Sequence, residues 1–316
     1  MSSAFMPVAE TSNRHKTKNN LKNNKNTLLI VIFLLPALIL FLTFVVYPIF
    51  QSLYYSMFDW SGLGPADDFV GLDNYRDILI DRVFLITIRN SLFIILFSLA
   101  FQLPMAMFLA VMVGKNLPGR AVFRSIFFMP YVISEVVAAI AWLFLFNPDP
   151  ARGLFNAIIE LIPGTSPVLW LADVNIVLPA IFVALTWKFF GFHMLLFLTG
   201  LQNIPRTIEE AARIDGASSI KSFFFITLPL LSGTIRTSVY LSVLGSIQQF
   251  ILVWIMSKGG PVNASETLAT YMYRFGFVRF QLGYGSAVAI YMFLMCLIFS
   301  LIYLKMTNKP DHLTGI

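Results

Sequence analysis

Six long apolar stretches, separated by polar segments, constrain this 316-residue chain more than any other feature of its sequence. A helix needs about 20 apolar residues to cross the hydrocarbon core of a bilayer. The stretches that qualify cover about residues 28–47, 90–114, 122–146, 175–199, 236–257 and 280–304. Only 12% of the residues are charged, against about 25% in soluble proteins. The sequence therefore predicts an all-α membrane protein with six transmembrane helices.

Lysine and arginine flank these stretches unevenly, which predicts their orientation. Basic residues collect in the N-terminal tail, in the second and fourth loops and at the C-terminus, whereas the first outer loop is acidic. The last outer loop is an exception, with Lys258, Arg274 and Arg279. We expect both termini in the cytoplasm, and the net charge of +6 indicates topology rather than nucleic-acid binding.

The same pattern divides the chain into three regions. Residues 1–26 are rich in Asn and Lys and are expected to form a disordered cytoplasmic tail. Residues 27–306 form the transmembrane domain, and residues 307–316 form a second cytoplasmic tail.

The polar loop at residues 205–229 has strong local signals for a helix–turn–helix element. Thr207 and Glu210 have capping-box spacing and predict a helix start. Gly216 predicts the end of that helix, because glycine adopts a left-handed conformation without a steric penalty. Ser218 is expected to cap a second, Phe-rich helix, and Pro229 marks the entry into the next span.

The first helix of this loop combines small and charged side chains. Ala211 and Ala212 are small enough to let another protein approach closely, and Glu209, Glu210, Arg213 and Asp215 could orient that protein by charge. On spacing alone, a solvated turn at the membrane surface is an equal alternative.

The loop resembles the EAA motif of ABC importer permeases. The resemblance covers Glu210-Ala211-Ala212, Gly216 after three residues, and Ile226-Thr227-Leu228-Pro229 after nine more. Three further segments resemble the carbohydrate, maltose-permease-like branch of that family: residues 69–75, residues 124–131, and Gly259-Gly260-Pro261 followed by Thr267. The large extra outer domain of the maltose permease has no counterpart in the short outer loops of this chain.

The resemblance implies a type I ABC importer permease fold in a bacterial or archaeal cell (inner) membrane, where lipid surrounds the spans. It implies that the 205–229 loop carries the coupling helix, which docks on an ATPase through Glu209, Glu210, Ala211, Ala212, Arg213, Asp215, Gly216 and Pro229. The implied partners are two ATPase subunits, a second homologous permease in a heterodimer, and an extracellular or periplasmic sugar-binding protein.

Motifs for chemistry are absent from the sequence. It contains no G-x-x-x-x-G-K-[ST] phosphate loop, no H-E-x-x-H and no G-x-S-x-G, and Cys296 is its only cysteine. We therefore expect no catalytic residue, no metal site and no cofactor in this chain, with ATP and Mg bound by the partner ATPase.

Two charged residues are expected near the middle of the membrane. Glu135 and Lys188 each lie about 13 residues into a span, where a lone charge costs roughly 2.5–3.5 kcal/mol. Either they form a structural ion pair, or one of them lines the path of the transported solute. An ion-driven secondary transporter of a small polar solute is the alternative function, with these two charges as a relay.

Other residues have the types that bind sugars, namely amides, hydroxyls and aromatic rings. The candidates for the substrate path are Trp187, Lys188, Ser246, Gln248, Gln249, Phe250, Tyr291 and Glu135. An aromatic residue in a span more often packs or faces lipid, and for the buried or cavity-facing His193 we favour structural use over ligand contact.

Overall fold

The computed structural model describes residues 29–114 and 119–307, and these ranges are mostly helical. Within them no strand forms, and the only sheet-like pairing is an isolated antiparallel bridge between Phe58 and Phe69. The predicted tail at residues 1–26 lies outside the described residues, and so does the predicted tail at residues 307–316 except for Thr307. The chain divides into two compact units at Tyr54–Tyr55.

The described part of the first unit belongs to a single long helix. Leu29–Tyr55 is helical over 27 residues and contains a π-helical turn, η1 (Leu42–Val46), followed by α2 (Tyr47–Tyr55). At about 1.5 Å per residue it is roughly 40 Å long, enough to cross a bilayer. None of its most apolar window is buried within the described chain, so this helix has no core of its own.

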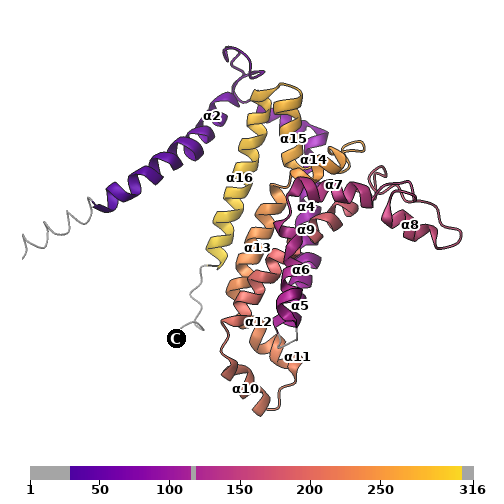
Figure 1. The fold of residues 1–316 in the computed structure, drawn as a ribbon. Coiled ribbons are helices and arrows are strands. Elements are labelled where there is room, and N and C mark those ends of the chain that lie inside the picture. The colour runs from indigo at the N-terminus through magenta and orange to yellow at the C-terminus, as the bar shows by residue number, and fades with distance from the viewer. Residues whose placement is uncertain (1–28, 115–118, 308–316) are drawn as a thin grey trace, which may run out of the picture. The chain divides into compact units, whose positions relative to one another are not determined.

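The second unit is a bundle of helices that run lengthwise, with short helices at both ends (Figure 1). Its elements are α3 (Asp73–Ile80), α4 (Arg82–Phe97), η2 (Ser98–Gln102), α5 (Leu103–Gly114), α6 (Arg120–Val132), α7 (Glu135–Leu145), α8 (Leu154–Glu160), α9 (Val177–Gln202), α10 (Arg206–Ile214), α11 (Ser219–Ser222), η3 (Phe223–Thr227), α12 (Leu228–Leu230), α13 (Ser232–Ile247), α14 (Ile251–Ser257), α15 (Leu268–Tyr273), η4 (Arg274–Val278) and α16 (Leu282–Thr307).

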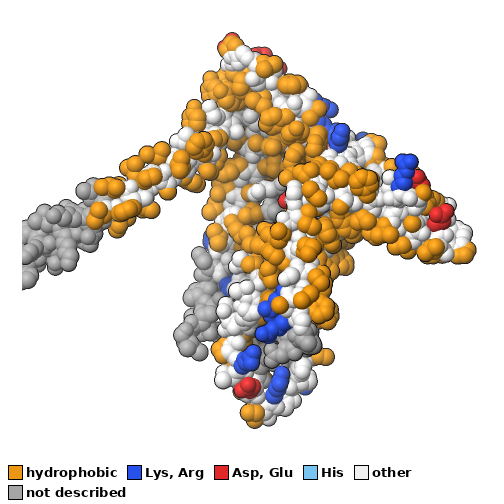
Figure 2. Space-filling model, viewed as in Figure 1, with side chains coloured by type: hydrophobic (Ala, Val, Ile, Leu, Met, Phe, Trp, Pro, Cys, Tyr) orange, Lys and Arg blue, Asp and Glu red, His pale blue; other side chains and the backbone are white. Residues whose placement is uncertain are grey.

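Helix α9 is the centre of this unit. It packs against α5, α6, α7, α13 and α14, and buried side chains occur all around it. A helix that is apolar on every side belongs in the interior of a bundle or in a membrane. Figure 2 shows apolar side chains along the bundle and most visible charges at its ends, near α10 and α8. This distribution is the one expected of a protein that crosses a membrane.

Among the described residues, four helices are long and apolar enough to cross a membrane, or up to six if two bent helix pairs, Arg120–Val132 with Glu135–Leu145 and Ser219–Leu230 with Ser232–Ile247, each count as one span. The four are Leu29–Tyr55, Arg82–Gly114, Val177–Gln202 and Leu282–Thr307. They match the first, second, fourth and sixth predicted spans, with ends that differ by up to eight residues. A mostly helical membrane architecture is thus confirmed, and the count of six stays a prediction.

The other two predicted spans are not continuous helices. Residues 122–146 divide into α6 and α7, which meet at an angle of 97°. Residues 236–257 divide into α13 and α14, because helical structure stops at Ile247 and resumes at Ile251. Each of these two predicted spans is therefore interrupted in the structure. Both contain polar residues, Ser134 in the first and Gln248-Gln249 in the second.

Candidate functional site: a polar cavity and a surface helix

A cavity of about 230 Å³ lies inside the bundle, between α4, η2, α6, α9 and α13. It is lined by Ile94, Ser98, Gln102, Tyr131, Leu185, Phe189, Phe192, His193, Leu241, Ser242, Gly245, Ser246 and Gln249. Two of these residues lie at the breaks of the third and fifth predicted spans: Tyr131 is next to the end of α6, and Gln249 lies between α13 and α14. The breaks thus bring irregular backbone to a cavity wall, where non-helical backbone is tolerated at membrane depth.

Hydroxyl and amide groups give the cavity its polar character. The Ser98 hydroxyl donates to Oε1 of Gln102 over 2.6 Å, and the Ser246 hydroxyl donates to the carbonyl of Ser242 over 2.8 Å. Because each hydroxyl donates its hydrogen to another protein atom, the lone pairs of its oxygen remain free to accept a hydrogen bond from a ligand. The Gln102 amide adds two N–H donors.

His193 also lines the cavity, and one nitrogen of its ionisable ring has no hydrogen-bond partner among the described residues. Its side chain is buried, and its Nδ1 atom makes no hydrogen bond within the described part of the chain. A buried polar atom without a partner is costly, so it calls for a ligand or a water molecule.

Aromatic rings form the remaining wall. Tyr131 stacks on Phe192 with ring centroids 5.0 Å apart, and its ring meets Phe189 edge-on at 6.3 Å. Rings of this kind offer apolar faces, and hydroxyls and amides beside them fix orientation. The cavity is smaller than the roughly 300–1,000 Å³ of typical small-molecule sites.

Two of the predicted path residues, Ser246 and Gln249, line this cavity. Four others lie elsewhere: Trp187 packs edge-on against Trp142, Phe250 stacks on Trp254, the Tyr291 hydroxyl donates to the carbonyl of Tyr75, and Gln248 approaches the sulfur of Cys296. Their roles in transport stay predictions, but the geometry favours Ser246 and Gln249.

The sequence reasoning missed several cavity residues. Ser98 and Gln102 are four residues apart inside an apolar span, so they share a helix face, and this spacing was a usable signal. Tyr131, Phe189 and Phe192 gave no comparable signal, because aromatic residues are frequent throughout the chain.

Lys188 and Glu135 lie outside the cavity lining. The Lys188 ammonium donates to the carbonyls of Pro130 (2.9 Å), Tyr131 (2.8 Å) and Ile133. Glu135 begins α7 and attracts Lys188 through space, but Lys188 makes its direct bonds to backbone oxygens. The direct partners of the lysine are therefore carbonyls that the sequence analysis did not consider.

The second candidate region is the loop at residues 205–229. Its first helix, α10, starts at Arg206 with Pro205 in the N-cap position, and no side chain caps it. The expected Thr207–Glu210 capping box is wrong, because Pro205 starts the helix early and leaves Thr207 inside it. The predicted end is confirmed: Gly216 has φ +79°, and Ser218 accepts from the Lys221 amide over 3.4 Å.

The end of α10 is a Schellman motif. The Gly216 amide donates to the carbonyl of Arg213 (3.1 Å), and the Ala217 amide donates to the carbonyl of Ala212 (2.9 Å). These bonds satisfy carbonyls that would otherwise lack partners at the helix end. The turn therefore fixes the direction in which the chain passes from α10 to α11.

The faces of α10 differ from expectation in one respect. Ala212 is buried against the protein, whereas Glu210, Ala211, Arg213, Asp215 and Gly216 are exposed. Ile214 is 87% exposed, which the sequence analysis did not anticipate. Of the other predicted docking residues, Glu209 lies within α10, and Pro229 is the second residue of the short α12. The exposed face thus combines charges with one large apolar side chain.

Comparisons with known proteins identify the family. Residues 102–308 match the family model of binding-protein-dependent transport system inner membrane components. The chain belongs to this family. Probable ABC transporter permease protein YurN of Bacillus subtilis is 34% identical over 91% of this chain and 99% of its own length. The trehalose/maltose transport system permease protein MalF of Thermococcus litoralis is 31% identical over 87% and 92%.

A solved structure has the same fold. It is a bacterial alginate ABC transporter in complex with an alginate pentasaccharide-bound periplasmic protein, and one of its chains aligns with a TM-score of 0.79 at 24% identity. The alignment covers 91% of this chain and 96% of that chain. The family places this permease among inner-membrane transporter subunits rather than enzymes.

Proposed function

We propose that this permease forms part of the path by which an ATP-driven importer moves a sugar or oligosaccharide across the inner membrane. The observation that carries the proposal is the cavity between α9 and α13, which combines hydroxyls, amides and aromatic faces in an otherwise apolar bundle. Sugars present hydroxyls and apolar ring faces together, and this lining complements both. The sugar-permease relative supports the choice of substrate class.

The proposal includes the partners. A sugar-binding protein delivers the substrate on the outer side, as the alginate transporter complex suggests, and a second, homologous permease completes the transmembrane path. Two ATPase subunits, which bind ATP and Mg, dock on the exposed face of α10. Both termini and α10 then lie in the cytoplasm, and the six predicted helices, bent pairs included, cross the bilayer.

Transport follows from a two-state change. ATP-driven closure of the ATPase pair shifts the equilibrium between inward- and outward-facing arrangements, because nucleotide and docked binding protein favour one of them. The alternative of an ion-driven transporter leaves the α10 surface without a role, and the family match gives it no support.

Uptake by the reconstituted complex tests the proposal. The permease is co-expressed with its candidate partners and placed in vesicles with a panel of radiolabelled sugars and their binding protein. Uptake that requires ATP, and that resists dissipation of ion gradients, is expected. Uptake that continues without ATP and collapses with the proton gradient would refute it.

A further inference from the structure

The bend between α6 and α7 leaves backbone carbonyls that need partners. The last carbonyls of an α-helix have no amide within the helix to bond with, and α6 ends at Val132 after an internal proline, Pro130. The chain then turns through 97° into α7. In a bilayer, each unsatisfied carbonyl at such a bend costs several kcal/mol.

Lys188 of α9 supplies those partners. An ammonium group has three N–H donors, and the structure gives it three acceptors, the carbonyls of Pro130, Tyr131 and Ile133. Lys188 is only 3% exposed. A cation at a helix C-terminus is also favoured by the helix dipole. The positive charge is therefore used where α6 ends, in a position that no solvent reaches.

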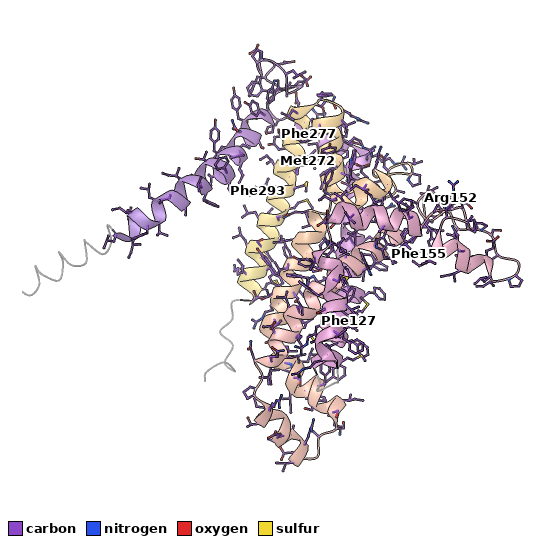
Figure 3. The ribbon with its side chains drawn as sticks, in the orientation of Figure 1. Phe127, Arg152, Phe155, Met272, Phe277 and Phe293 are labelled. Atoms are coloured by element: carbon purple, nitrogen blue, oxygen red, sulfur yellow. The ribbon has the colours of Figure 1, made fainter. Side chains whose placement is uncertain are left out.

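A second contact fixes the same two helices. Gly191 lies three residues after Lys188, so both face α6. A Cβ atom at Gly191 would overlap the carbonyl oxygen of Phe127, which belongs to a residue on α6 (Figure 3). Backbone contact at Gly191 and the ammonium at Lys188 thus hold α6 at two levels of α9.

The bend that Lys188 holds carries part of the cavity wall. The carbonyl of Tyr131 accepts a hydrogen bond from Lys188, and Tyr131 also lines the cavity. The Lys188 ammonium also lies 5.6 Å from the centre of that ring. Phe192, on the next turn of α9, stacks on the same ring at 5.0 Å. A movement of the bend would therefore move the Tyr131 wall.

We propose that Lys188 is a positioning residue. Its ammonium donates to the carbonyls at the C-terminal end of α6 and so holds the Tyr131 wall of the cavity in place, rather than serving as the counter-ion of Glu135. The inference rests on the proposed function only in treating the cavity as the sugar path. Its test requires no sugar, so its failure and the failure of the proposed function can be told apart.

The test measures access to the cavity with a thiol reporter. Gly245 lines the cavity, and a Cβ atom there meets nothing within 4 Å, so Gly245→Cys fits without a clash. In a Cys296→Ala background, the complete transporter is labelled with a small polar methanethiosulfonate and the rate is measured. Lys188→Met, which removes all three donors at similar length, should accelerate labelling by at least about tenfold, the size expected for the loss of even one charge-assisted hydrogen bond.

A double variant separates the two roles of the lysine. If Lys188 holds carbonyls, Lys188→Met/Glu135→Gln labels as fast as Lys188→Met alone, because neutralising Glu135 supplies no donor. A return to the parent rate in the double variant would show a counter-ion role and overturn the proposal, as would an unchanged rate in Lys188→Met. Thr199→Val is the matched control on α9: it removes a hydroxyl bonded only to Leu195 of its own helix and should leave the rate unchanged.

A second variant applies if Lys188→Met is not recovered from the membrane. Lys188→Gln keeps N–H donors and loses the charge. Labelling within about threefold of the parent supports donation to the carbonyls, whereas a fast rate that Glu135→Gln restores to normal overturns it. A merely structural role would lower the yield of protein and leave the labelling rate of the recovered fraction unchanged.

Discussion

Gly216 ends the α10 helix, and replacing it should uncouple ATP hydrolysis from transport. Its φ of +79° is left-handed, and an added Cβ would meet nothing within 4 Å. Substitution therefore brings no clash, and its cost is the backbone conformation alone. That cost is about 1–2 kcal/mol for an ordinary residue and more for a β-branched one. A cost of this size lowers the population of the Schellman turn roughly 5- to 30-fold.

Three variants rank this effect. Gly216→Val should lose most of the coupling, and Gly216→Asn should lose less, because asparagine tolerates the left-handed region. Gly233→Ala is the control, since Gly233 lies inside α13 with open space around it and has no left-handed φ. Alanine there should be neutral or stabilising by up to about 1 kcal/mol.

The assay compares three quantities in the co-expressed transporter: permease yield in the membrane, co-purified ATPase, and the number of sugars taken up per ATP hydrolysed. Yield should be equal in all variants, and the transport ratio should fall in the order parent, Asn, Val. Equal losses for Asn and Val would refute the argument from φ and indicate that side-chain size against the partner decides. Loss of yield in Gly216→Val alone would instead assign the glycine a role in folding.

Two further predictions concern the outer loop and the cavity. The fully buried carboxylate of Glu266 lies 2.6 Å from the Arg274 guanidinium. Arg274→Met should therefore destabilise the protein by about 3–5 kcal/mol, because it leaves a buried charge without its partner. Arg152→Met is the control: it removes an exposed ion pair with Asp149 and should leave the melting temperature unchanged. Burial raises the pKa of Glu266 although Arg274 opposes the shift. The Arg274→Met penalty should therefore be present while Glu266 is ionised in the folded protein, and it should disappear as the pH falls through the raised folded pKa; a penalty that does not change with pH contradicts this. In the cavity, Gln249→Ala should lower uptake roughly 2- to 10-fold by removing a hydrogen bond, while Gln248→Ala, next to it in the sequence, should not lower uptake. Equal effects would show that lining the cavity does not determine which glutamine matters for uptake.

The sequence predicted what depends on composition and on local chemistry. Apolar length located the four continuous helices, and the glycine and serine signals located the end of α10 and the start of α11. These features depend on a few neighbouring residues, so no knowledge of the fold was needed. Membership of the importer permease family could likewise be predicted, because the defining positions of the EAA motif lie within one loop.

The breaks in the third and fifth spans could not be read from hydropathy. Both halves of each span are apolar, and an apolar run has the same appearance whether the helix continues or turns. The partners of Lys188 were hidden for the same reason. Backbone carbonyls become acceptors only where a helix ends, so a charged residue was matched with the nearest opposite charge, Glu135. The capping box failed for a different reason, since Pro205 determined where α10 began.

The exposure of Ile214 has a consequence for handling the isolated permease. Ile214 is a large apolar side chain on a surface helix, and Ile220 and Phe225 of the same loop are also exposed. This loop therefore presents apolar surface on a part of the chain that is expected outside the detergent belt. When no ATPase covers it, copies of the permease should associate through this surface. Ile214→Ser should keep the solitary chain monodisperse during size-exclusion chromatography, and the same substitution should weaken retention of the ATPase.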